Sequence, residues 1–178
     1  TLNFDNTIGL ENLHFDTIST SNNIWEIGIP NKNKFDSALS LPNAICTDLN
    51  SGEILFNVKV FEPDTIYRIH AVNSYATPTP CIEEGFVYVH FGRYGTACLN
   101  TNNGEIMWKR TDLQCEHVQG PGSSPIIHNE KLILHLEGTD VQYIIALDKK
   151  TGETIWKTER PAECYEPLAE IGKKAYIT

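Results

Sequence analysis

Residues 146–156, with the sequence ALDKKTGETIW, carry a pattern that occurs three times in the chain. The other copies are CTDLNSGEILF at residues 46–56 and CLNTNNGEIMW at residues 98–108. In each copy a small residue ends an apolar run, and a polar turn closed by a glycine leads into a second apolar run. Polar turns of this kind between apolar runs are typical of β-hairpins, in which the glycine adopts a positive φ. The three glycines are Gly52, Gly104 and Gly152.

Each copy ends in a large aromatic residue, and these residues are Phe56, Trp108 and Trp156. They lie 52 and 48 residues apart, and a period near fifty indicates a repeat architecture. We therefore expect each ring to be buried at the same place in successive units.

Two of the units divide into four short strands each. We expect the first set at residues 75–82, 86–91, 96–100 and 105–110, and the second at 123–128, 131–137, 141–148 and 153–158. Short connections favour an antiparallel meander. Residues 86–91 are mostly apolar on both faces, so their sheet must be covered on both sides, as in sheets stacked around an axis. The sequence thus predicts an all-β fold, a β-propeller of four-stranded antiparallel blades.

About three to three and a half blades are expected in this chain, which is fewer than the roughly four to eight that close a propeller. We interpret residues 1–178 as a single partial β-propeller domain, with units at approximately 24–60, 75–110, 121–158 and 164–178. The first unit is expected to be incomplete, because Trp25 resembles the aromatic of a last strand but lies only 31 residues before Phe56. The last unit is expected to be the start of a further blade, and the chain to be part of a longer propeller.

Composition and charge exclude several classes of function. The chain is 40% hydrophobic and 10% aromatic, which is enough to bury a core in 178 residues. Its net charge of −9 disfavours nucleic acid or an anionic membrane surface as the main partner. No apolar run approaches the roughly 18 to 20 residues of a transmembrane helix.

Five cysteines without a C-x-x-C pair exclude a simple zinc ribbon. Cys46 and Cys98 occupy the position of Ala146, so we expect them to serve as small packing residues. The others are Cys81, Cys115 and Cys164.

The pattern A-x-D-x-x-x-G-x-x-x-W, met in full by Ala146, Asp148, Gly152 and Trp156, resembles the repeat of the quinoprotein-like, or PQQ-like, β-propellers. Residues 73–80, 87–92, 95–99, 120–125 and 137–142 resemble a bacterial branch of PQQ-binding-like propellers related to the propeller lipoprotein of outer-membrane protein assembly. The resemblance covers residues 24–178 and implies a bacterial protein of the periplasm or another extracytoplasmic site. Quinoprotein dehydrogenases of this kind hold PQQ with polar residues, calcium and commonly two adjacent cysteines, and this sequence has no Cys-Cys pair.

Long loops are expected at one face of the propeller, at residues 61–74, 92–95, 111–122, 137–140 and 159–164. Long loops on a rigid scaffold are where binding concentrates. The candidate ligand- or partner-binding residues on this loop-rich face are His70, Asn73, Arg93, Tyr94, His117, Gln119, Asp140 and Arg160.

Individual candidates have alternative interpretations. Cys115 and His117, with His70, could ligate zinc or copper, although a loop that hydrogen-bonds its own backbone explains the same residues. Arg93 and Asp140 could pair across units or contact an anionic ligand. His90 and His135 occupy equivalent repeat positions, which indicates a structural role.

Three functions are compatible with the sequence. The leading hypothesis is a non-enzymatic binding or scaffold module of the cell envelope, which takes a protein or polymer partner and has no cofactor. The first alternative is a quinone- or metal-dependent oxidoreductase of the quinoprotein type. The second is a carbohydrate-recognition module, since Tyr75, Tyr94 and Tyr165 are expected near the loop-rich face and aromatic rings often stack on sugars.

Overall fold

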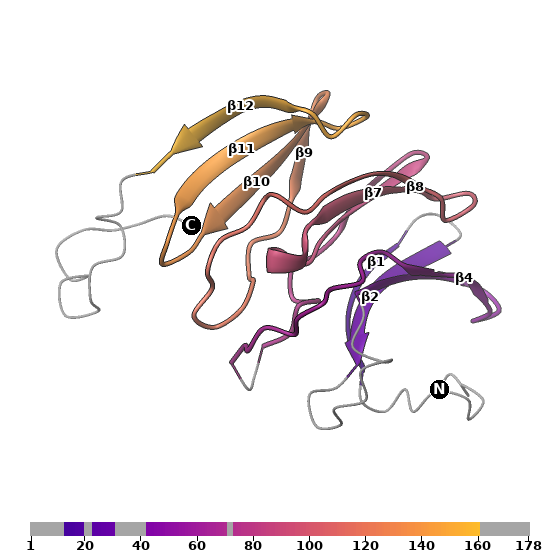
Figure 1. The fold of residues 1–178 in the computed structure, drawn as a ribbon. Coiled ribbons are helices and arrows are strands. Elements are labelled where there is room, and N and C mark those ends of the chain that lie inside the picture. The colour runs from indigo at the N-terminus through magenta and orange to yellow at the C-terminus, as the bar shows by residue number, and fades with distance from the viewer. Residues whose placement is uncertain (1–12, 20–22, 31–41, 71–72, 161–178) are drawn as a thin grey trace, which may run out of the picture.

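The computed structural model describes residues 13–19, 23–30, 42–70 and 73–160, and it contains three four-stranded antiparallel sheets (Figure 1). The first sheet has the order β1-β2-β3-β4, with β1 (Leu13–Ser19), β2 (Asn23–Pro30), β3 (Asn43–Asp48) and β4 (Ile54–Lys59). The second has the order β5-β6-β7-β8, with β5 (Cys81–Glu83), β6 (Phe86–His90), β7 (Thr96–Asn100) and β8 (Ile106–Arg110). The third is formed in the same way by β9 (Ile126–His128), β10 (Lys131–Glu137), β11 (Gln142–Asp148) and β12 (Thr154–Glu159).

The repeated hairpin has the same register in all three sheets. Phe56 pairs with Cys46, Trp108 with Cys98 and Trp156 with Ala146, and in each hairpin the register shifts immediately after the small residue. The four-stranded antiparallel sheets and the shared register confirm the predicted fold class, a partial β-propeller.

The turns of these hairpins are held by hydrogen bonds that the sequence pattern predicted. The Oδ1 atoms of Asp48, Asn100 and Asp148 accept bonds of 2.8 to 2.9 Å from the amide two residues further on. Gly52, Gly104 and Gly152 have φ values of 74°, 70° and 74°, in the left-handed region that favours glycine. Hydrogen bonds from Ser51 hold the pKa of Asp48 below its usual value, and one from Thr151 does the same for Asp148.

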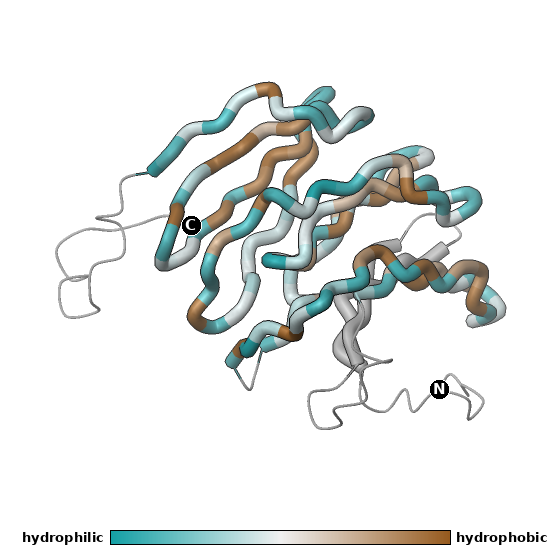
Figure 2. The backbone as a smooth tube through the Cα atoms, in the orientation of Figure 1, coloured by the Kyte–Doolittle hydropathy of each residue, from teal (hydrophilic) through white to brown (hydrophobic). Residues whose placement is uncertain are grey.

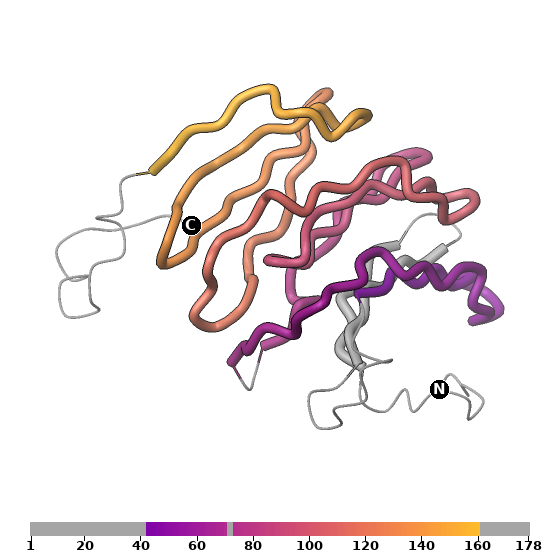
Figure 3. Tube along the Cα trace, in the orientation of Figure 1, coloured from indigo at the N-terminus to yellow at the C-terminus, as the bar shows by residue number. Residues whose placement is uncertain are grey.

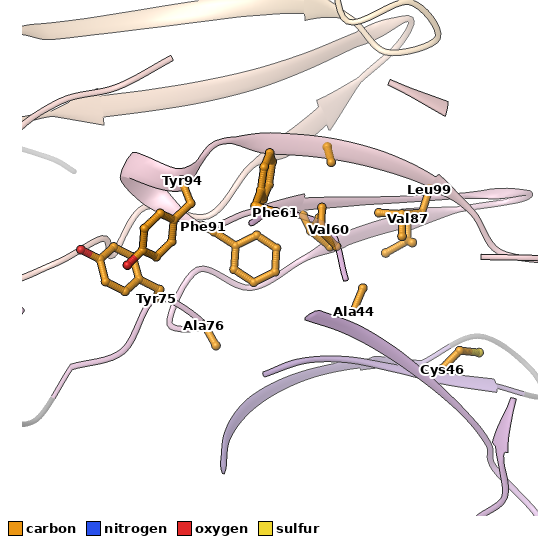
Figure 4. Packing of buried hydrophobic residues seen from close by; sticks show 12 residues of the cluster. Ala44, Cys46, Val60, Phe61, Tyr75, Ala76, Val87, Phe91, Tyr94 and Leu99 are labelled. Carbon is orange, nitrogen blue, oxygen red and sulfur yellow. The ribbon is translucent and has the colours of Figure 1, made fainter. Parts of the chain in front are cut away.

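The sheets stack face to face, and hydrophobic segments run along the strands of the second and third sheets (Figure 2). Between the first and second sheets, Ala44 and Cys46 face Val87 and Leu99, while Phe61 and Phe91 pack edge to face beside them (Figure 4). Between the second and third sheets, Tyr88 and Cys98 pack against Leu132, Leu134 and Leu147. Cys46 and Cys98 are fully buried in these layers, which confirms their expected packing role.

Gly104 and Gly152 each lie against the aromatic residue of the preceding sheet. A Cβ atom at Gly152 would come within 2.7 Å of Trp108 Cδ2, and one at Gly104 within 3.3 Å of Phe56 Cβ. The indole nitrogen of Trp108 also donates a 2.9 Å hydrogen bond to Lys149 O, in the turn that contains Gly152. Trp156, expected to be buried, is instead 38% exposed, because no described residue covers that face of the third sheet.

The structure corrects the expectation for the first unit. Its sheet has four strands and is not incomplete in the described residues. Trp25 lies in β2, the second strand, and pairs with Cys46 on the side opposite Phe56. Cys46 thus pairs with an aromatic residue on each of its two neighbouring strands. For this reason Trp25 resembled the aromatic residue of a last strand. The missing strand is β1, which the sequence analysis did not assign.

Two further expectations need adjustment. β5 and β9 are shorter than the strands expected at residues 75–82 and 123–128, since prolines such as Pro80 and Pro125 cannot donate to a ladder. A single 3-10 turn (Gly92–Tyr94) interrupts the connection from β6 to β7. The unit expected at 164–178 lies outside the described residues. None of the described helices is long and apolar enough to span a membrane.

Replacing Gly152 by alanine should destabilise the fold more than replacing Gly85 by alanine. Both glycines have positive φ values, 74° and 84°, so each change costs about 1–2 kcal/mol from the backbone. Only the new Cβ at position 152 would collide with Trp108, because nothing lies within 4 Å of one at position 85. Urea unfolding should show an additional loss of about 1–3 kcal/mol for Gly152→Ala. Equal losses for the two variants would contradict the proposed contact.

Candidate functional site

The long connections lie at one end of the stacked sheets and the short hairpin turns at the other (Figure 3). We use the term loop-rich face for the end formed by residues 60–70, 73–80, 91–95, 111–125 and 138–141. Two of the connections, β4 to β5 and β8 to β9, join one sheet to the next, and the others join β6 to β7 and β10 to β11. The sequence predicted this separation from the lengths of the connections.

Asn73 fastens two of these connections together. Its Nδ2 donates to Gln119 O at 2.7 Å and to Pro121 O at 3.2 Å, and the His70 amide donates to Gln119 O at 3.2 Å. Its Oδ1 accepts hydrogen bonds from the Ser74 amide and the Thr77 hydroxyl. The structure therefore brings the candidate residues His70, Asn73 and Gln119 together and gives the Asn73 side chain a structural role.

Asp140 fastens the next pair of connections. Its Oδ1 accepts a 2.7 Å hydrogen bond from the Glu116 amide, while the Thr139 amide donates to Glu116 O at 2.9 Å. Partial burial would raise the pKa of Asp140, but backbone hydrogen bonds led by that of Glu116 outweigh it and hold the pKa below its usual value. Glu116 is thus fixed at both its backbone amide and its carbonyl.

Arg93 lies in the 3-10 turn between β6 and β7. Its guanidinium carbon is 4.0 Å from the centre of the Tyr67 ring, and its Nη2 is 3.8 Å from Glu116 Oε1. Its Nε atom is buried without a hydrogen-bond partner among the described residues. The next residue, Tyr94, points inward and packs against Tyr75 with ring centres 4.4 Å apart (Figure 4). Tyr94 is only 6% exposed, so it belongs to the core and not to the surface where the sequence analysis placed it.

Cys115 and His117 are neighbours beside this cluster. Cys115 Sγ lies 3.2 Å from His117 Nε2, and burial raises the pKa of the thiol to about 12. Burial also lowers the pKa of His117. Among the described residues no three His, Cys, Asp or Glu side chains are arranged to hold a metal ion.

Arg160 does not join the cluster around Arg93. Its Nη1 donates to Glu137 Oε1 at 2.7 Å and contacts His135 Nε2, so it pairs within the third sheet. His90, the repeat equivalent of His135, is buried and its Nδ1 is 2.9 Å from Thr96 Oγ1. This supports the structural role that the repeat position indicated for His90.

Two residues of the cluster were absent from the sequence-based candidates. Glu116 lies between Cys115 and His117, which the sequence analysis singled out as possible metal ligands. Their position in the chain was the signal that could have identified Glu116. Tyr67 carried no signal, because only the folding of its connection over the turn Gly92–Tyr94 places its ring against Arg93.

The stacked sheets with a shared aromatic register define a β-propeller of the PQQ-like class. The family model described as outer membrane protein assembly factor BamB matches residues 38–159, and the chain belongs to this family. No curated protein matches the sequence.

Solved structures with a similar fold come from two kinds of protein. The quinohemoprotein alcohol dehydrogenase of Comamonas testosteroni has a TM-score of 0.57 at 16% identity, over 84% of this chain and 22% of that chain. The enzyme ADHIIG of Pseudomonas putida HK5 has a TM-score of 0.57 at 14% identity, over 80% and 20%. BamB from Moraxella catarrhalis has a TM-score of 0.50 at 11% identity, over 80% and 37%. These identities establish the fold alone, and the chain spans well under half of each protein.

The stability of the protein should fall between pH 6.5 and 4 because of His90. Burial, with a smaller effect from His117, lowers the pKa of His90 from 6.5 to about 4. As the pH falls, the unfolded chain therefore binds this proton first. The contribution of neutral His90 is complete above pH 6.5 and declines toward pH 4 by up to about 3 kcal/mol.

Urea unfolding of His90→Asn over this pH range should show a shallower decline than the unchanged protein. His128→Asn is the control, because His128 is exposed and its replacement should leave the slope as it was. Carboxylates with lowered pKa values affect the stability at lower pH. All three proteins contain them, so they do not alter the comparison. The same slope in His90→Asn and the unchanged protein would be incompatible with this role.

Proposed function

We propose that the chain is a non-enzymatic binding or scaffold module of the bacterial cell envelope, which contacts a protein partner through its loop-rich face. The carrying observation is that the connections of this face are fastened to one another by Asn73 and Asp140. Surfaces ordered before binding lose less conformational entropy when a partner docks. The description of its family as an outer membrane assembly factor supports an extracytoplasmic site and a protein partner.

Exposed apolar side chains on the loop-rich face support a protein as the partner. Val118 is 63% exposed, Ile66 is 53% exposed and Val141 is 40% exposed. They come from three different connections and are interspersed with polar residues. Apolar side chains with polar surroundings on a surface are typical of sites where proteins bind.

The carbohydrate alternative receives less support from the described residues. Tyr75 and Tyr94 are 5% and 6% exposed, so neither ring offers a face to a sugar. Tyr165 lies outside the described residues. Tyr67 is half-buried, and the guanidinium of Arg93 already covers its ring.

A photoreactive amino acid at Val118 should form covalent adducts with a protein of the cell envelope when cells are irradiated. The same amino acid at Asn102, an exposed residue of a short hairpin turn at the opposite end, serves as the matched control. Mass spectrometry of the purified adducts should find one envelope protein from Val118 and none above background from Asn102. A Val118→Asp change should also reduce adducts formed from a photoreactive residue at Ile66. No difference between the two labelled positions would count against the proposal.

A further inference from the structure

Arg93 differs from Arg110 and Arg160 in having no close acceptor among the described residues. The guanidinium of Arg110 makes two bonds of 2.7 Å to Asp112 and a 2.6 Å bond to Gly152 O. Arg160 makes a 2.7 Å bond to Glu137. The distance from Arg93 Nη2 to Glu116 is 3.8 Å, well beyond the roughly 2.7–2.9 Å of a charge-assisted hydrogen bond.

The environment of Arg93 fixes the guanidinium, while its donors make no close hydrogen bond to the described residues. The Tyr67 ring covers one face of the group, and the side chain as a whole is 27% exposed. The turn that carries Arg93 is anchored by buried Tyr94 and by Gly92, which lies against Pro121. A planar group with five donors, held in this way, matches the geometry of a carboxylate.

Glu116 has the properties of a carboxylate that can be displaced. Its backbone is held by Asp140 and Thr139, so its position beside Arg93 is set. Its side chain is 56% exposed and makes only the long contact to Arg93 among the interactions of the described residues. The nearby Asp140 carboxylate is occupied by backbone amides. The carboxylates of Glu116 and Asp140 already place two negative charges near the Arg93 guanidinium, which cannot balance a third. An incoming anion would therefore take the place of Glu116 beside Arg93.

We propose that Arg93 is the receptor for a carboxylate side chain of the protein partner, and that Glu116 occupies its place until the partner binds. This inference rests on the proposed function of the loop-rich face. The exposed side chain of Val118, two residues beyond Glu116, predicts apolar residues next to the partner's carboxylate.

The test uses the protein labelled with ¹⁵N-arginine and the blocked tripeptide Leu-Glu-Leu as the probe. The chain has four arginines, so the Nε–H signal of Arg93 can be assigned by substitution. The peptide should shift this signal in a saturable way, and the glutamine analogue Leu-Gln-Leu should not. Arg93→Lys keeps the charge but loses the planar fork, and it should weaken binding of the peptide, read from the amide signals of the loop-rich face.

The decisive variant is Glu116→Gln, for which the proposal expects tighter binding. Removing the competing carboxylate should lower the Kd of the peptide about two- to fivefold, as expected for the loss of one surface ion pair. Glu137→Gln is the matched control, because Glu137 pairs with Arg160 instead, and it should leave the Arg93 signal and the affinity unchanged.

Three results would overturn the carboxylate receptor: no shift of the Arg93 signal, an equal response to the glutamine analogue, or unchanged or weaker binding by Glu116→Gln. Adducts from Val118 together with any of these results would leave the binding role of the loop-rich face intact. Absence of both the adducts and the shift would remove the proposed function as well.

Discussion

The contact between an aromatic ring and the turn glycine of the next sheet holds the structure together. Trp108 packs against Gly152 and donates to Lys149 O, and Phe56 occupies the same place beside Gly104. A side chain at either glycine would collide with the ring, and most residues with a side chain disfavour the positive φ. The residue at the turn must therefore both lack a side chain and adopt a positive φ. This explains why the aromatic residue and the glycine recur together in the sequence.

Around this contact, polar groups extend the interface between the second and third sheets. Lys149 Nζ pairs with Glu83 at 3.0 Å, and the other carboxylate oxygen of Glu83 accepts a 2.8 Å hydrogen bond from the buried Tyr88. Arg110 adds its bond to Gly152 O. The sheets are thus locked at the end with short turns, which leaves the opposite end to the long connections.

The arrangement at the loop-rich face follows from this stacking. Connections from neighbouring sheets meet at this end, and Asn73 and Asp140 join them by side chain to backbone hydrogen bonds. These hydrogen bonds hold the connections in place relative to one another. Arg93 has no close hydrogen-bond acceptor among the described residues, and this gives the binding hypothesis a specific residue.

The sequence alone determined the features that depend on near neighbours in the chain. The hairpin turns, the four-stranded units and the burial of Cys46 and Cys98 follow from a repeated pattern in which Asp48 or Asp148 bonds an amide two residues away. The strand β1 and the true place of Trp25 were missed, because no repeat of the pattern marks them. Only the tertiary structure decided that Tyr94 turns into the core while Arg93 meets Tyr67 and Glu116. These partners come from separate connections, and the stacking of whole sheets, which local residue patterns do not encode, brings them together.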